Sequence, residues 1–403
     1  MHRILSIFIG LLSICFLASC TGGSSSTLLP ETGSEPTACI DGQAAGFPCK
    51  AITLEKRVTL STLGATAGND IWGWTDSTNG VEYALMGLNN GTAFVRIDNP
   101  QNPVIVGTLP TQTVPSSWRD IKVYQNHAFI IADRSGAHGM QVFDLTRLRT
   151  NNTNVTFTPD KVYSEFTTAH NIVINEDSGC AYIVGTNTCG GGLHMVDIQD
   201  PVNPTFMGCH TADGDTHDAQ CVNYIGPDTD YIGKEICFDS NESSVGIVDV
   251  SVKSNTISIA SQDYPNLAFT HQAWLDETQR YLLVNDEFDE QNFGVRTRTM
   301  VLDVSDLDNP VYLYTHRGTT NAIDHNLYVV GKKIYEANYE SGLRILEFTD
   351  LSTDTLSEVA FFDTYPESNE AKINGAWSVY PFFPSGTIVV SDINRGLFIL
   401  TPE

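Results

Sequence analysis

The chain has 403 residues, of which 41% are hydrophobic, and it contains 32 glycines and 17 prolines. This composition supplies a packed core and favours strands joined by turns over long helices. The formal net charge of −26 argues against nucleic acid as a partner, because phosphate binding needs a basic surface. Such an acidic chain has either a solvated, self-repelling exterior or sites for cations, and composition does not choose between them.

The N-terminus predicts an export signal. The positive start "MHR" precedes "ILSIFIGLLSICF", an apolar stretch too short for a comfortable transmembrane helix. The following "LASC" resembles a bacterial lipoprotein processing site, which implies cleavage before Cys20 and lipids on its sulfur and new amino group. An ordinary secretory signal with a chance cysteine is the alternative. We therefore predict a signal peptide over 1–19, a flexible tether over 20–38 and a folded domain over 39–403.

Thr21, and not aspartate, follows the lipidated cysteine. In Gram-negative lipoproteins this favours the outer membrane, so we expect an exported protein anchored by lipid at the outer membrane or cell surface of a Gram-negative bacterium. Export places the other cysteines in an oxidising compartment. None of their spacings suggests a zinc site, because there is no C-x-x-C. We predict three disulfides and one free thiol: Cys39–Cys49, Cys189–Cys209, Cys221–Cys237 and free Cys180.

A repeat runs along the rest of the chain. Apolar segments end at an acidic residue every 44 to 54 residues. These acidic residues are Asp98, Asp144, Asp197, Asp249, Asp303 and Glu347. Periods of this length with several strands each are typical of a β-propeller. Each unit divides into four short strands separated by turns rich in glycine, asparagine and aspartate. We expect the aspartates at the ends of the apolar segments to cap the backbone of the turns that follow.

The number of units sets the number of blades. First strands begin near Asn69, Arg119, His170, His217, His271, His325 and Asn374. The seventh unit has only three strands, and residues 51–61 at the other end of the domain supply a fourth. We therefore predict an all-β, seven-bladed β-propeller of four-stranded antiparallel blades, closed by an N-terminal strand that completes the last blade and removes open edges.

The segments "VDIQDPVNP", "LDVSDLDNP" and "GLRIL" resemble LVIVD repeats. The chain from "ACIDGQAAGFPC" through "GAHGMQVFDLTRLR" resembles the bacterial "choice-of-anchor B" family, and the resemblance covers essentially the whole mature protein. It implies an exported protein that shares one domain with its relatives but uses its own surface anchor, here the lipid on Cys20. The family brings no settled biochemical activity, so the site must be argued from the residues.

Four histidines recur at the starts of first strands in consecutive units. They are His170, His217, His271 and His325, spaced by 47, 54 and 54 residues. First strands are innermost in a propeller, so these residues are expected to meet at the mouth of the central channel. Neutral imidazole is a common ligand of zinc, copper and iron. We predict that the four hold a transition metal or a polar ligand, and the alternative is that they satisfy backbone groups with no ligand.

Other polar residues occupy the same strand starts and are predicted to bind a ligand or to orient the histidines. They are Asp70, Arg119, Asp120, Asn171, Asp218, Gln272 and Asn326. Structural hydrogen bonding between strand ends is the alternative for this set. The loop "NDEFDEQNFG" at 285–294 could bind calcium through its carboxylates, or it is a solvated acidic loop, since it lacks EF-hand spacing.

Catalytic signatures are scarce, with no G-x-S-x-G, P-loop or H-E-x-x-H sequence. An enzyme would have to be a metal-dependent hydrolase or oxidoreductase, with Asp218 or Glu287 as general base. The favoured prediction is a binding or scaffold module. It is a monomeric propeller that contacts the membrane through its lipid and presents the histidine-rich face to a small ligand, a metal or an unknown extracellular protein.

Overall fold

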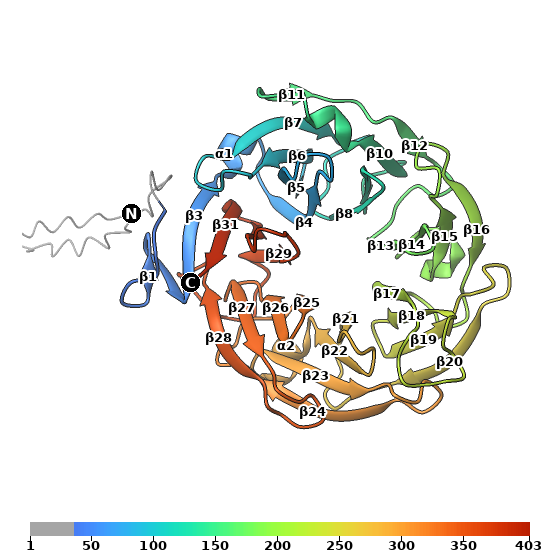
Figure 1. Cartoon of the computed structure of the whole chain (residues 1–403). Coiled ribbons are helices and arrows are strands. Elements are labelled where there is room, and N and C mark those ends of the chain that lie inside the picture. Colours follow the sequence, from blue (N-terminus) through green and yellow to red (C-terminus); the bar gives the residue numbers. More distant parts are fainter. Residues whose placement is uncertain (1–35) are drawn as a thin grey trace, which may run out of the picture.

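The computed structural model describes residues 36–403, which form a ring of sheets around a central axis (Figure 1). Within this range there are seven sheets, each built on four antiparallel strands paired in succession. This confirms the prediction of a seven-bladed β-propeller. The predicted signal peptide over 1–19, the predicted lipidation site at Cys20 and the predicted tether as far as residue 35 lie outside the described residues.

The blades are numbered here from β4, and each runs from an innermost strand at the axis to an outer strand at the rim. The innermost strands are β4 (Gly68–Thr75), β8 (Arg119–Tyr124), β13 (Asn171–Asn175), β17 (Asp218–Asn223), β21 (Thr270–Leu275), β25 (Asn326–Val330) and β29 (Ala376–Tyr380). The second strands are β5 (Glu82–Leu88), β9 (His127–Ala132), β14 (Cys180–Val184), β18 (Glu235–Ser240), β22 (Tyr281–Asp286), β26 (Lys333–Ala337) and β30 (Ile388–Asp392). The third strands are β6 (Gly91–Arg96), β10 (Met140–Asp144), β15 (His194–Asp197), β19 (Val245–Asp249), β23 (Arg298–Asp303), β27 (Leu343–Glu347) and β31 (Gly396–Pro402). The outer strands are β7 (Val104–Pro110), β12 (Lys161–Tyr163), β16 (Thr205–Cys209), β20 (Ile257–Gln262), β24 (Val311–Arg317), β28 (Ser357–Phe362) and β3 (Ile52–Val58).

Burial changes across each blade, because neighbouring blades pack face to face. Every residue of β18 and β22 is buried, so both faces of these second strands carry core side chains. The outer strand β16 is mostly exposed, and every residue of the outer strand β20 is exposed or half-buried. This gradient explains why apolar runs without polar alternation mark the middle strands, whereas the outer strands carry more polar residues.

The ring closes as predicted. Strand β3 pairs antiparallel with β31, in a register that runs from Ile52 opposite Pro402 to Val58 opposite Leu397. Figure 1 shows the blue N-terminal strand beside the red C-terminal one. A further bridge joins Thr37 to Leu54, so the chain contacts the propeller slightly before the predicted boundary at residue 39.

Some elements lie outside the predicted pattern. Strands β1 (Gln43–Ala44) and β2 (Phe47–Lys50) form a hairpin that adds to the outer edge of blade six, and β11 (Val155–Thr156) pairs parallel with β7. The short α-helices are α1 (Leu60–Leu63) and α2 (Asp289–Phe293), with 3-10 turns at Leu145–Leu148 and Cys189–Gly191. Between residues 36 and 403 no helix combines the length and apolar character needed to cross a bilayer.

The disulfide predictions are confirmed within the described chain. Its three disulfides are Cys39–Cys49, Cys189–Cys209 and Cys221–Cys237, while Cys180 is a buried free thiol. The last pair lies directly across the β17–β18 hairpin. The predicted structural role is confirmed for four of the five repeated aspartates, each of which accepts a backbone N–H two residues on. They are Asp144, Asp197, Asp249 and Asp303.

Candidate metal centre on the propeller axis

The starts of the innermost strands surround a cavity of about 490 Å³ on the axis. All four predicted histidines line it, and so do Asp70, Asp120, Asn171, Asp218, Gln272 and Asn326. The circular geometry therefore brings together residues from six consecutive blades. Arg119 is the one member of the predicted set whose side chain does not line this cavity.

The four histidines stand side by side around the wall of the cavity. Ring centroids are 4.4 Å apart from His170 to His217, 4.3 Å from His217 to His271 and 4.1 Å from His271 to His325. Each comes from the start of the innermost strand of its own blade. Histidines that are one blade apart in the sequence are therefore neighbours in space, with adjacent imidazole rings.

Hydrogen bonds to Nδ1 orient three of these rings. The Nδ1 of His217 lies 3.1 Å from the backbone carbonyl of His271, and the Nδ1 of His325 lies 2.6 Å from that of Trp377. The Nδ1 of His170 lies 3.2 Å from an Asp133 carboxylate oxygen. An Nδ1–H that donates to such an oxygen fixes the tautomer and leaves Nε2 with a free lone pair. Within residues 36–403 none of these Nε2 atoms has a hydrogen-bond partner.

Burial keeps the rings of His217, His271 and His325 neutral. Burial, followed by the neighbouring histidines, lowers the pKa of His217 and of His271 well below the ordinary value. Burial lowers the pKa of His325 to about 3. Neutral imidazole is the form that binds a metal. At neutral pH no proton competes with a metal for the nitrogens of these three rings.

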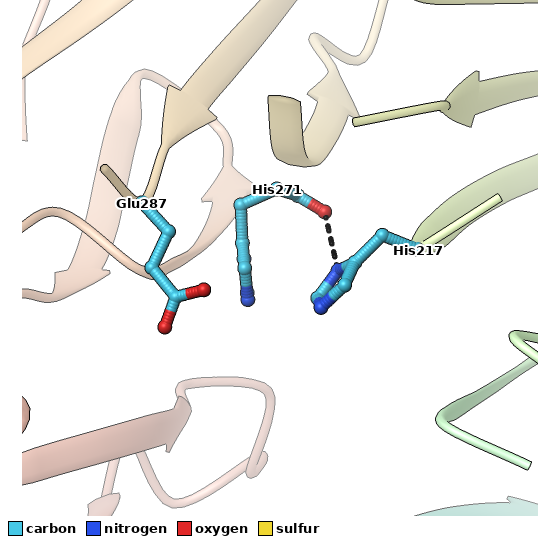
Figure 2. Close-up of side chains that lie close together, drawn as sticks. All are labelled: His217, His271 and Glu287. Atoms are coloured by element: carbon cyan, nitrogen blue, oxygen red, sulfur yellow. Dashed lines mark hydrogen bonds between the residues drawn. The ribbon is translucent and has the colours of Figure 1, made fainter. Parts of the chain in front are cut away.

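A carboxylate completes the group. Glu287 follows β22, and its Oε1 accepts a hydrogen bond of 2.8 Å from the Tyr339 hydroxyl. One carboxylate oxygen of Glu287 and one ring nitrogen from each of His217 and His271 all lie within 4.8 Å of one another. Figure 2 shows the two rings side by side with the carboxylate next to His271. Burial raises the pKa of Glu287.

The polar residues that accompany the histidines at the strand starts connect neighbouring blades. Gln272 accepts the backbone N–H of Leu327 at 2.6 Å, and Asp120 accepts that of Ile172 at 2.7 Å. The other amides do the reverse and donate to the next blade, Asn171 to the His217 carbonyl at 2.8 Å and Asn326 to the Trp377 carbonyl at 3.1 Å. This is the structural role that the sequence left open for the set. Ligand binding by the same residues stays a prediction.

Lys122 closes the floor of the cavity. Its ammonium group lies 2.6 Å from Asp120 and 3.7 Å from Asp70, and 4.6 Å above the Trp72 ring. Lys122 also lines a second cavity of about 420 Å³ with Trp72, Trp274 and Tyr380, so it stands between the two. Near this ammonium, burial raises the pKa of Asp218 to about 7. Sequence reasoning missed Lys122, although its place two residues after Asp120 on an innermost strand puts both on the axial face.

Arg119 was expected at the channel mouth, and that expectation is wrong. Its Nε donates to the Leu88 carbonyl at 3.1 Å, and its Nη1 lies 3.1 Å from His138 Nε2. The side chain is 2% exposed. Arg119 lies within the regular pairing of β8, opposite Ala132, whereas His170, His217 and His325 precede their strands and His271 lies at a register shift. Alternate residues of a regular strand point to opposite faces. Asp120 takes the axial face, so Arg119 enters the space between blades.

His138 makes the stability of this packing sensitive to pH. Burial and the adjacent Arg119 lower the pKa of His138 to about 4, below the unfolded value of about 6.5. The unfolded chain therefore takes up a proton between these values while the folded chain does not, so stability falls as pH decreases through this range. We expect His138→Gln to reduce that fall by up to about 1.4 kcal/mol per pH unit. Urea unfolding at pH 7, 6 and 5 measures the free energy of unfolding of both proteins. If this free energy falls equally with decreasing pH in the wild type and in His138→Gln, His138 is not the cause of the pH dependence.

The acidic loop at 285–294 is not a solvated loop, and that alternative is wrong. Asp286 accepts the backbone N–H groups of Ala268 and Phe269 at 2.7 and 2.8 Å. Glu287 lines the axial cavity, while Asp289 and Glu290 are buried in helix α2. The short helix turns these carboxylates inward, which a loop drawn from sequence alone does not predict.

Fold and site together define a seven-bladed β-propeller with a histidine-lined cavity on its axis. No protein-family model matches the chain, and no curated protein matches it. Solved structures match the fold. They include a protein from Lactobacillus plantarum (12% identity, TM-score 0.53, covering 75% of this chain and 84% of that one) and Kuenenia stuttgartiensis hydrazine synthase (11%, 0.53, 78% and 91%). The β-propeller domain of Myceliophteria thermophila Cps50 (Swd1) is also similar (9%, 0.52, 84% and 98%). At these identities the likeness establishes the fold alone.

Proposed function

We propose that this protein is a binding module that holds a transition metal ion, zinc, iron or copper, in its axial cavity and binds a small polar ligand beside it. The observation that carries the proposal is the convergence of His217, His271 and Glu287, whose ligand atoms lie within 4.8 Å of one another. Metal–ligand distances of about 2.0–2.2 Å require donor atoms somewhat closer than this. Small side-chain rotations at the cavity wall supply the difference.

The donor set favours particular metals. Two imidazoles and one carboxylate are found in catalytic zinc sites and in non-haem iron sites, both of which keep open positions for a ligand. His170 and His325 flank the pair within ring-stacking distance and offer two further nitrogens. A third or fourth imidazole would also suit copper.

Residues around the donors support the same assignment. The Tyr339 hydroxyl holds Glu287, the Asp133 carboxylate holds His170, and the carbonyls of His271 and Trp377 face Nδ1 atoms. Groups of this kind orient metal ligands and fix the histidine tautomer. These contacts orient the side chains of the proposed ligands and leave only small rotations for metal binding.

The size of the cavity favours a ligand in addition to the ion. A volume of about 490 Å³ falls within the range of small-molecule sites and exceeds what one ion and its waters need. The lining is polar on the floor, where Lys122 meets Asp70 and Asp120, and aromatic at Trp118 and Phe269 on the wall. A small molecule with both a charged and an apolar part fits this lining.

A metal-dependent hydrolase or oxidoreductase on the same site is the second candidate. It is favoured by one feature, the three-residue donor set, which leaves open coordination positions in a sheltered cavity. Glu287 would then act as a ligand, and Asp218, which lines the same cavity, is the remaining candidate for a general base.

The N-terminal sequence supports a proposal about the location of the protein. We propose export, lipid attachment at Cys20 and display at the outer membrane or cell surface, together with membership of the LVIVD-repeat "choice-of-anchor B" family. The lipoprotein-like "LASC" and the repeat motifs support this part of the proposal. Three disulfides within the described chain agree with an oxidising compartment.

Metal analysis of protein purified without an affinity tag tests the proposal. We expect close to one zinc, iron or copper per chain, or uptake of one equivalent by chelator-treated protein during dialysis. Turnover by the loaded protein that is absent from the metal-free protein would favour the enzyme over the binding module. If none of the three metals binds at stoichiometric level under either condition, the proposed function is wrong.

A further inference from the structure

A second group of carboxylates lies between blades five and six. Helix α2, in the loop between β22 and β23, carries Asp289 and Glu290, and Asp324 comes two residues before β25 in the next blade. One oxygen from each of the three carboxylates lies within 4.8 Å of the others. The three residues are 0%, 4% and 0% exposed, so the group is shielded from water.

Several oxygens at this place have no hydrogen-bond partner within residues 36–403. They are both carboxylate oxygens of Glu290, the Oδ1 of Asp289 and the amide oxygen of Asn285. The Nδ2 of Asn285 donates to Asp324 Oδ2 at 2.9 Å, which places that amide beside the carboxylates. A buried polar atom with no partner destabilises the fold, because it loses its hydrogen bonds to water without replacement. Four of them in one place indicate a missing positive partner.

The charge balance leads to the same conclusion. The Arg298 Nε contacts Asp289, and its two terminal nitrogens donate to the carbonyls of Pro265 and Asn266. Arg298 thus offsets one of the three carboxylates. Burial of the other two charges requires a cation or bound protons.

We propose that Asp289, Glu290, Asp324 and Asn285 bind a calcium ion that joins blade five to blade six. The donors are all oxygens and include three carboxylates, which is the chemistry that calcium prefers. Magnesium usually keeps several waters in a strict octahedron, whereas the carboxylates of this group are shielded from water. The proposal does not depend on a metal at the axis.

The position of the ion gives it a structural role. Glu287 comes two residues before Asp289, and His325 directly follows Asp324. Calcium at this point would therefore fix the loop that carries Glu287 against the strand that begins beside His325. It would stabilise one side of the axial cavity.

Calcium binding to the full chain, treated with EGTA and then dialysed, provides the test. We expect one tightly bound calcium by equilibrium dialysis with radioactive calcium, and a melting temperature higher by several degrees than in EGTA. Glu290→Gln keeps the shape of the side chain and removes its charge, so it should weaken calcium binding at least 100-fold. The His217→Ala/His271→Ala protein should bind calcium as the wild type does, which separates this site from the axial one.

The matched control is Asp308→Asn. Asp308 belongs to an acidic group with Asp228 and Asp306, in which Asp306 and Asp308 are exposed, so the substitution removes the same charge at the surface. It should leave calcium affinity unchanged. The proposal is overturned if the wild type neither binds calcium stoichiometrically nor gains thermal stability from it, or if Asp308→Asn abolishes binding and Glu290→Gln does not. The wild-type measurement decides even if Glu290→Gln fails to fold.

Discussion

Replacement of both His217 and His271 by alanine should abolish stoichiometric binding of metal at the axis. The change removes two of the three donors that lie within 4.8 Å of one another and leaves Glu287 without a nitrogen partner. His170 and His325 cannot replace the pair, because the vacated positions lie between them on the cavity wall. We expect a loss of affinity on the order of 10³-fold or more, measured by titration of chelator-treated protein with zinc.

The fold should survive this double substitution. Both rings face a cavity and stack on neighbours, so their removal should cost about 1–3 kcal/mol of unfolding free energy. His127→Ala/His316→Ala is the matched control, since it removes two imidazoles outside the cavity. This control should bind zinc like the wild type. Retained zinc in the cavity variant, or lost zinc in the control, would refute the assignment of the donors.

Replacement of Lys122 by methionine should be among the most destabilising single changes in the chain. The ammonium group is buried against Asp120 and Asp70, and its attraction to them raises the pKa of Lys122 even though burial acts in the opposite direction. Methionine fills similar space but leaves two buried carboxylates without a cation. Removal of one partner from a buried ion pair costs about 3–5 kcal/mol. Chemical denaturation at pH 7.5 should show a loss of this size.

Lys372→Met supplies the comparison for that experiment. Lys372 pairs with Glu370, and both side chains are largely exposed, at 60% and 67%. An exposed pair contributes little, so we expect a change below about 0.5 kcal/mol. If both substitutions lower the free energy of unfolding by the same amount, the buried ion pairs of Lys122 do not stabilise this part of the cavity.

The ring could be predicted because its signal repeats. Each blade supplies an apolar pattern that recurs at one interval, and the aspartates that close the third strands fall in step with it. The missing fourth strand of the last unit required a partner, and residues 51–61 were the available segment. In the structure, β3 (Ile52–Val58) occupies that place. The four histidines met at the axis for the same reason, since their spacing matched the blades.

The remaining features depend on the path of individual loops. Glu287 reaches the histidines only because the turn after β22 bends toward the axis, and helix α2 then buries Asp289 and Glu290. Asp324 joins them from the next blade, which no local pattern indicates. Arg119 shows the opposite error. It lies at the predicted start of its innermost strand, but its side chain packs between blades and does not face the cavity.

Anomalous diffraction from crystals of the metal-loaded protein, recorded on both sides of the absorption edge of the metal, tests the central proposal most directly. We predict one strong peak in the axial cavity, about 2.0–2.3 Å from the Nε2 atoms of His217 and His271 and from a Glu287 oxygen. A peak elsewhere, or an empty axis in crystals whose protein carries one equivalent of metal, would contradict it.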